Sequence, residues 1–225
     1  MAVNREAYEQ IVADLGSHRV TLVAVSKTKS VEEIKEVYDL GQKDFGENYV
    51  QELTEKQSEL PKDIRWHFIG HLQGNKVKQI APFVHLIQSV DSLKLLQEIN
   101  KQAKKFNRVI DCLLQVHIAQ EETKFGFDER ELTQILATIS DSPLANIHVA
   151  GLMGMASFTD DMNKVKIEFR YLKRLFEQYE KWTIDNCQFA ILSMGMSGDY
   201  QIAIEEGSTM VRIGSLIFGA REARN

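Results

Sequence analysis

Short apolar segments alternate with helical patterns along nearly the whole chain, and this alternation restricts the possible folds more than any other feature. Eight segments have the apolar, β-branched composition of buried strands, and a helical pattern separates each one from the next. The predicted strands are Arg19–Ser26, Asp44–Glu47, Arg65–Gly70, Val84–Val90, Val109–Ile118, Ile147–Met155, Phe189–Met194 and Met210–Phe218. Eight βα units in 225 residues predict an α/β fold, a (β/α)₈ TIM barrel.

An amphipathic segment, Arg5–Leu15, precedes the first strand and predicts an extra N-terminal helix. The competing architecture is an open doubly wound sheet, which usually has about five or six strands. A G-x-G-x-x-G fingerprint after the first strand would favour that sheet, and the sequence has none there. The chain has only three prolines and no Gly/Ser-rich linker, so residues 1–225 are predicted to form a single domain.

Composition excludes several classes of protein. No apolar run approaches about 18 residues and the N-terminus is too polar for a signal peptide, which predicts a cytoplasmic protein without membrane spans. The net charge of −5 is interspersed along the chain and argues against nucleic acid as the main partner. The histidines are scattered, and no metal site is predicted. Cys112 and Cys187 lie in or beside apolar segments and are interpreted as reduced core thiols.

The first predicted strand is followed at once by a lysine, Lys27. Three residues later, Ser30 and Glu33 form a capping-box pattern that begins the next helix. An amine at the carboxyl end of a buried strand lies where α/β proteins build their active sites. The alternative is an ordinary solvated lysine at a strand end.

The segments after the seventh and eighth strands predict an anion site. In Ser193–Asp199, Ser197 is a candidate N-cap, and Gly198 allows the backbone to approach a ligand. Gly214 and Ser215 can add further donors, and this fold usually binds phosphate at these two loops. The alternative is that both are turns with ordinary caps. An amine beside a phosphate site fits a phosphorylated aldehyde held as an imine, either pyridoxal 5′-phosphate (PLP) or the substrate of a sugar phosphate aldolase.

Seven motifs, in the same order along the chain, closely resemble those of the pyridoxal phosphate homeostasis protein family, whose members are related to the barrel domain of alanine racemase. They are Val25–Lys29, Phe45–Glu52, Trp66–Lys76, Lys124–Gly126, Gly151–Met155, Leu192–Asp199 and Arg212–Gly219. The likeness extends from about residue 5 to Arg221. It implies an alanine racemase N-terminal-domain-like barrel that binds PLP, a monomer, and a role in intracellular PLP homeostasis and delivery to PLP-dependent apo-enzymes.

The resemblance also implies roles for single residues. Lys27 matches the lysine that holds the cofactor as a Schiff base, and Arg212 matches the arginine that meets the pyridine nitrogen. Ser197, Gly214 and Ser215 match the phosphate contacts, with Gly198 beside them, whereas Asn48 and Met153 fall in motifs that line the cofactor pocket. Serine at position 215, where threonine is common in the family, keeps the hydroxyl. Lys29, Lys76 and Lys124 are candidates for a secondary contact, or simply solvated lysines.

The residue types leave the choice between carrier and catalyst open. Arginine only donates hydrogen bonds, so Arg212 requires an unprotonated pyridine nitrogen, which is a poorer electron sink than a protonated one. In racemases a second domain of a partner subunit supplies a tyrosine to the other face of the cofactor, and this chain ends directly after the eighth strand. We therefore expect a PLP carrier without racemase-like activity. The alternative is a fold-type III PLP-dependent amino-acid racemase or lyase.

Overall fold

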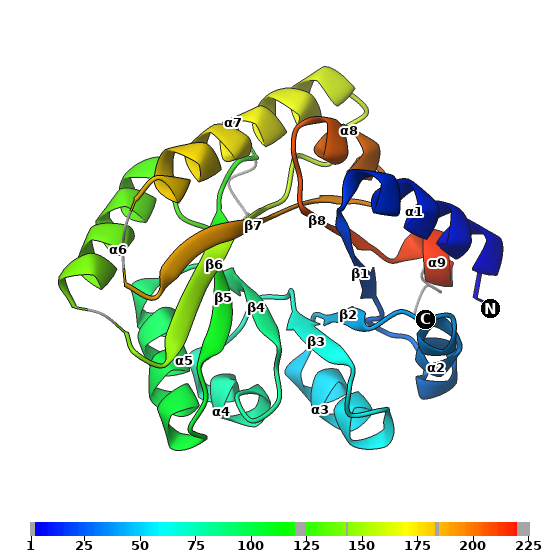
Figure 1. Cartoon of the computed structure of the whole chain (residues 1–225), viewed down its shortest axis with the longest axis horizontal. Helices are drawn as coiled ribbons and strands as arrows, with labels where there is room; N and C mark the ends of the chain where they lie inside the picture. Colours follow the sequence, from blue (N-terminus) through cyan, green and yellow to red (C-terminus); the bar gives the residue numbers. More distant parts are fainter. Residues whose placement is uncertain (1–2, 120–124, 143, 183–184, 220–225) are drawn as a thin grey trace.

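The computed structural model describes residues 3–119, 125–142, 144–182 and 185–219. Within them, eight parallel strands form a closed barrel in which each strand pairs with the next along the chain and the last pairs with the first (Figure 1). The strands are β1 (Thr21–Val25), β2 (Asp44–Glu47), β3 (Arg65–Phe68), β4 (Leu86–Val90), β5 (Ile110–Val116), β6 (Ile147–Gly154), β7 (Cys187–Met196) and β8 (Met210–Ile213). The predicted (β/α)₈ barrel is confirmed.

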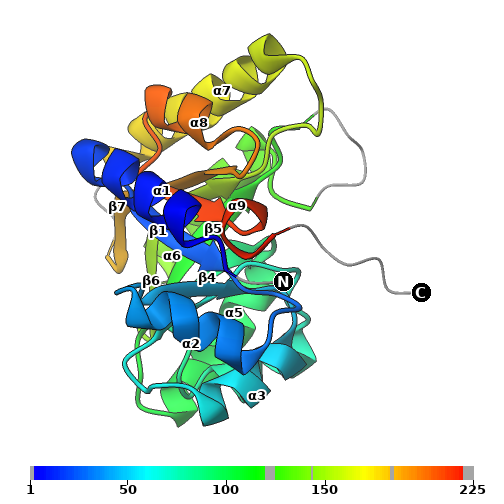
Figure 2. The same cartoon turned by 90° about the vertical axis from the view of Figure 1, so that its right-hand side faces the viewer.

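Helices cover the outside of the barrel, with α7 and α8 on one side of the strands and α2 and α3 on the other (Figure 2). They are α1 (Arg5–His18), α2 (Val31–Asp39), α3 (Val50–Glu59), α4 (Val77–Ile80), α5 (Leu93–Lys105), α6 (Glu129–Asp141), α7 (Met162–Glu180), α8 (Tyr200–Glu205) and α9 (Ser215–Phe218), with a 3₁₀ turn at Gly74–Lys76. The predicted N-terminal helix is α1, which packs against β1 and α9. None of the described helices has the length and apolar character needed to cross a membrane.

Side chains of successive strand residues alternate between two cores. On β1, Leu22 and Ala24 belong to the large core between strands and helices, whereas Val23 belongs to a second apolar cluster inside the barrel. The other buried members of that inner cluster are Leu86, Leu113, Ala150, Met153 and Met210. Because alternate side chains of a strand point to opposite faces, the positions after Val23 that face the barrel interior are Val25 and then Lys27.

Most predicted strand ends lie within two residues of the observed ones, but that of the eighth strand is wrong by five. The eighth strand ends at Ile213, and Ser215–Phe218 form a helix, with the N–H groups of Ile217 and Phe218 bonded to the carbonyl of Gly214. The apolar run after Gly214 is too short for its periodicity to separate strand from helix.

Asp44, a buried carboxylate at the amino-terminal end of the barrel, forms an ion pair with the half-exposed Arg65. Its carboxylate accepts bonds from Nε and Nη2 of Arg65 and from Nε2 of His67, on the neighbouring strand. Burial alone would raise the pKa of Asp44, but the hydrogen bonds from Arg65 and His67 and the positive charge of Arg65 outweigh burial and lower it to about 2. Asp44 is therefore ionised at neutral pH and stabilises the folded state.

Replacement of this carboxylate is expected to cost stability in a pH-dependent way. Because the folded pKa lies below the unfolded value near 3.9, Asp44→Asn should lower the free energy of unfolding by about 2 kcal/mol at pH 7. That difference should shrink as the pH falls from about 5 through 2, because wild-type Asp44 becomes protonated over this range. Urea unfolding of both proteins at several pH values measures it. Asp39→Asn, which removes an exposed partner of Lys35, is the control and should change little. A loss of unfolding free energy in Asp44→Asn that does not change with pH would contradict the lowered pKa of Asp44 as its cause.

Candidate functional site

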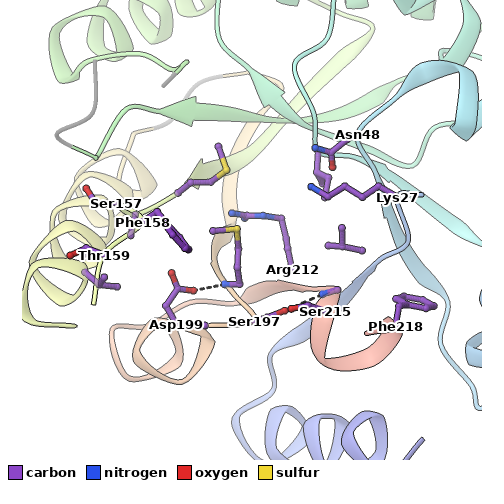
Figure 3. Close-up of a pocket in the computed structure, with 18 of the residues that line it drawn as sticks. Lys27, Asn48, Ser157, Phe158, Thr159, Ser197, Asp199, Arg212, Ser215 and Phe218 are labelled. Carbon is purple, nitrogen blue, oxygen red and sulfur yellow. Dashed lines mark hydrogen bonds between the residues drawn. The ribbon is translucent and has the colours of Figure 1, made fainter. Parts of the chain in front are cut away.

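A cavity of about 700 Å³ lies at the carboxyl ends of the strands. Its walls come from the segments that follow β1, β2, β3, β6, β7 and β8, which are far apart in the sequence. Seven of the eight residues that the sequence predicts for cofactor binding line it: Lys27, Asn48, Ser197, Gly198, Arg212, Gly214 and Ser215. Figure 3 shows Lys27 and Asn48 on one wall, Ser197 and Ser215 on the opposite side, and Arg212 between them.

Lys27 lies in a tight loop between the end of β1 and the capping box that begins α2. The N–H of Lys29 bonds to the carbonyl of Ser26, and the predicted capping box of Ser30 and Glu33 is present at the start of α2. Thr28 has a φ of +65°, a left-handed conformation that is unfavourable for a β-branched residue. Its N–H donates to Glu52 Oε2 on α3 at 2.8 Å, which holds the loop in place.

A buried ion pair lies beneath this loop. Glu47, at the end of β2, is fully buried, and its Oε1 accepts bonds from Ser26 Oγ at 2.6 Å and from Lys56 Nζ at 2.8 Å. Lys56 also donates to the carbonyl of Ser26 and to Glu52 Oε2. Burial raises the pKa of Glu47, and the charge of Lys56 opposes this rise. The pair therefore ties α3 to the residue that precedes Lys27.

Sequence reasoning missed Lys56. Its only local signal is a spacing of four residues from Glu52, which is common on helix surfaces. Only the fold turns this lysine inward, where its side chain is 8% exposed.

Two hydroxyls and two glycines form the wall predicted to hold phosphate. The N–H of Gly214 donates to Ser197 Oγ at 3.3 Å and so joins the β7–α8 loop to the start of α9. A Cβ on residue 214 would lie 3.0 Å from the carbonyl oxygen of Val25, so glycine allows the end of β8 to approach β1, the strand that precedes Lys27. Asp199 also lines the cavity, and its Oδ1 accepts a hydrogen bond from the N–H of Met196 at 2.5 Å. This wall offers hydroxyl and N–H donors of the kind that bind phosphate.

Arg212 rises from β8 into the floor of the cavity and is 4% exposed. Its Nη1 donates to Ser193 Oγ at 2.5 Å and its Nη2 donates to the carbonyl of Gly154 at 3.0 Å. Burial lowers the pKa of Arg212 to about 10, and the nearby charge of Asp199 opposes that change. The guanidinium is therefore charged at neutral pH, and protein acceptors fix its orientation.

Asn48 supplies a second sign that the cavity takes a polar ligand. Its Oδ1 is buried and has no hydrogen-bond partner among the described residues. A buried polar atom without a partner costs free energy, so such atoms in a cavity usually meet a ligand or water. In Figure 3 this side chain lies beside that of Lys27.

Met153, the eighth predicted residue, does not line the cavity. It is fully buried in the inner apolar cluster, one layer below the cavity floor. Met155, two positions closer to the carboxyl end of the strand and on the same face, lines the cavity in its place. Sequence reasoning also missed the following residues, Ala156–Asp160, which carry no recognisable ligand-binding pattern. Lys29 lines the cavity, whereas Lys124 lies outside the described residues.

Comparisons with known proteins give consistent matches over most of the chain. The family model described as "Alanine racemase, N-terminal domain" matches residues 4–222. Pyridoxal phosphate homeostasis protein of Pasteurella multocida (strain Pm70) is 41% identical over 208 residues, which cover 90% of this chain and 87% of that protein. The protein of the same name from Aquifex aeolicus (strain VF5) is 41% identical over 211 residues, covering 93% of this chain and 91% of that protein.

A solved structure agrees with these matches. PipY of Synechococcus elongatus PCC7942, determined with PLP bound, superposes with a TM-score of 0.83 at 33% sequence identity. The match covers 93% of this chain and 99% of that one.

Proposed function

Because the chain belongs to the alanine racemase N-terminal domain family, and within it to the pyridoxal phosphate homeostasis proteins, we propose that it binds PLP and takes part in PLP homeostasis. The observation that supports this most directly is the arrangement of one cavity. An amine (Lys27), a buried guanidinium (Arg212) and a wall of hydroxyl and N–H donors (Ser197, Gly214, Ser215) face the same space. These groups are complementary to the aldehyde, the pyridine nitrogen and the phosphate of a single PLP molecule.

Each residue has a separate task in this proposal. The amine of Lys27 condenses with the aldehyde to form a Schiff base, with release of one water molecule. Arg212 donates to the pyridine nitrogen, which must then be unprotonated because a guanidinium has no acceptor. Ser197, Gly198, Gly214 and Ser215 hold the phosphate, and Asn48 lies close to the reacting amine. PLP itself supplies the electrophilic aldehyde and an electron-withdrawing ring.

Carrying the cofactor, rather than catalysis, is the function that the pocket supports best. Arg212 keeps the pyridine nitrogen unprotonated, which disfavours carbanion chemistry. The amine of Lys29, a second lysine in the cavity wall, donates to the carbonyl of Phe218 at 2.6 Å. The second candidate function is a PLP-dependent racemase or lyase of amino acids, which the match to the alanine racemase domain favours.

We propose further that the protein is a cytoplasmic monomer with a single PLP-binding domain, residues 1–225. PLP-dependent apo-enzymes are the proposed recipients of the cofactor.

A transfer assay distinguishes carrier from catalyst. The protein loaded with PLP should activate an added apo-enzyme, while L-alanine incubated with the loaded protein should remain unracemised. Turnover of about 1 per second or faster would be on the usual enzymatic scale and would identify a racemase. Apo-enzyme activity and the D-alanine content, measured by chiral chromatography, are the readouts. A dialysis membrane between the two proteins tests whether transfer needs direct contact.

A further inference from the structure

A line of hydrogen-bonded polar side chains crosses the barrel interior, from the floor of the cavity to the opposite, amino-terminal end. Each member comes from a different strand and is at most 7% exposed. In order from the cavity, the members are Arg212 (β8), Ser193 (β7), Gln88 (β4), His67 (β3) and Asp44 (β2). We refer to these five residues as the interior relay.

Four hydrogen bonds connect the interior relay. Arg212 Nη1 donates to Ser193 Oγ at 2.5 Å, and Ser193 Oγ donates to Gln88 Oε1 at 2.7 Å. The other end of the same amide, Gln88 Nε2, lies 2.9 Å from His67 Nδ1. The second ring nitrogen, His67 Nε2, lies 3.0 Å from Asp44 Oδ1. The hydrogen bonds of the interior relay thus run without a break from one end of the barrel to the other.

The two ends determine the direction of every hydrogen bond between them. Arginine can only donate, so Ser193 accepts from Arg212 and has its single proton for Gln88 Oε1. The amide N–H₂ of Gln88 then faces His67 Nδ1, which must accept and carry no proton. At the other end an ionised carboxylate only accepts, so His67 Nε2 carries the proton. One arrangement satisfies all five groups, and in it His67 is neutral and protonated at Nε2.

The amino-terminal end of the interior relay lies in a second cavity, of about 220 Å³. There Asp44, His67 and His85 each place one potential metal-ligand atom within 4.8 Å of the others. Both carboxylate oxygens of Asp44, however, already accept bonds from Arg65, whose positive charge would also repel a cation. We therefore interpret this cluster as the anchor of the relay and not as a metal site.

We propose that Gln88 and His67 are positioning residues for Arg212. Neither residue lines the cofactor cavity. Because Gln88 accepts the proton of Ser193, the Ser193 hydroxyl oxygen is oriented to accept from Arg212. This hydrogen bond holds the guanidinium where it meets the ligand. This role rests on the proposed function, in which Arg212 contacts the pyridine nitrogen of PLP. It predicts that a change deep in the barrel alters both the affinity for PLP and the absorbance of the bound cofactor.

The direction of the relay is tested first, on the wild-type protein without added PLP. ¹⁵N NMR of histidine-labelled protein distinguishes a ring nitrogen that carries a proton from one that accepts a hydrogen bond. His67, assigned by comparison with a His67→Gln variant, should be protonated at Nε2 and unprotonated at Nδ1 near neutral pH. A proton on Nδ1 would reverse the amide of Gln88 and overturn the proposal. This outcome does not depend on whether PLP binds.

The positioning role is tested with Gln88→Met, which keeps the approximate side-chain volume and removes the two hydrogen bonds of Gln88 in the relay, together with its contact to Met210 Sδ. The matched control is Gln115→Met, which removes another buried glutamine, bonded to the carbonyl of Phe125 at 2.9 Å and not part of the relay. Gln88→Met should bind PLP about tenfold more weakly than the control and show a shifted absorbance at saturating PLP. A merely structural role would lower the folded fraction without changing the spectrum of the bound cofactor.

Equal affinity and equal spectra for the two glutamine variants would overturn the positioning role. If Gln88→Met does not fold, Ser193→Ala interrupts the relay with a smaller change. It should also weaken PLP binding and shift the absorbance of the bound cofactor. If Ser193→Ala showed neither effect, the positioning role would be overturned as well. Wild-type protein that fails to bind PLP would instead refute the proposed function.

Discussion

The Lys27→Ala protein is expected to fold normally and to lose its stable complex with PLP. In the proposed function, Lys27 in the cavity wall forms the covalent bond to the PLP aldehyde. Alanine at this position leaves only the non-covalent contacts with PLP. The apparent dissociation constant should rise by at least about 100-fold, which corresponds to roughly 2.8 kcal/mol of binding free energy. Absorbance titration with PLP, followed by borohydride reduction and peptide mass spectrometry, measures the affinity and locates the modified lysine.

The matched control for this experiment is Lys29→Ala. Lys29 lines the same cavity two residues away, but its amine donates to the carbonyl of Phe218 and lies 3.5 Å from Glu33. The variant should retain the coloured complex, with the reduced adduct on Lys27. An adduct on another lysine in the Lys27→Ala protein, at undiminished affinity, would show that the Schiff base forms elsewhere.

The second large effect concerns stability. Lys56→Met should lower the free energy of unfolding by about 3–5 kcal/mol at neutral pH, because it leaves the fully buried carboxylate of Glu47 without its cation. The carbonyl of Ser26 loses a hydrogen-bond donor as well, and Ser26 directly precedes Lys27. Urea denaturation monitored by circular dichroism measures the loss.

The pH dependence of this loss has a definite sign. In the variant, burial without the opposing charge raises the pKa of Glu47 further, so the ionised form destabilises the fold. The deficit of Lys56→Met should therefore be full above the folded pKa and shrink as the pH falls towards the unfolded value near 4.3.

Two comparison proteins test the cause of the destabilisation. Adding Glu47→Gln to Lys56→Met removes the buried charge and should restore at least about half of the lost stability. Lys35→Met removes an exposed lysine that pairs with Asp39 four residues away and should cost no more than about 0.5 kcal/mol. If Lys56→Met lost less than about 1 kcal/mol, or the second substitution brought no recovery, the ion pair would not be the support of the Lys27 loop.

Local patterns in the sequence were sufficient for the barrel and for part of the site. Eight strands were predicted from runs of apolar residues, and the start of α2 from the capping pair of Ser30 and Glu33, since both depend on neighbouring residues alone. Lys27 was recognised as a candidate because it follows a buried strand at the end where α/β proteins build their sites, whereas Arg212 was assigned from the family resemblance. The short segment after Gly214 was assigned to a strand wrongly, because four residues do not reveal a helical period.

The sequence by itself determined the order of strands and helices and the end of the barrel where the candidate site lies. Only the tertiary structure decided that Met155 and not Met153 lines the cavity, that Lys56 turns inward to Glu47, and that polar residues of five strands form the interior relay. The physical reason is the range of the interactions. Helix caps and apolar alternation act over a few residues, whereas Gln88 and Ser193 meet across 105 positions of sequence and become neighbours only when the barrel closes.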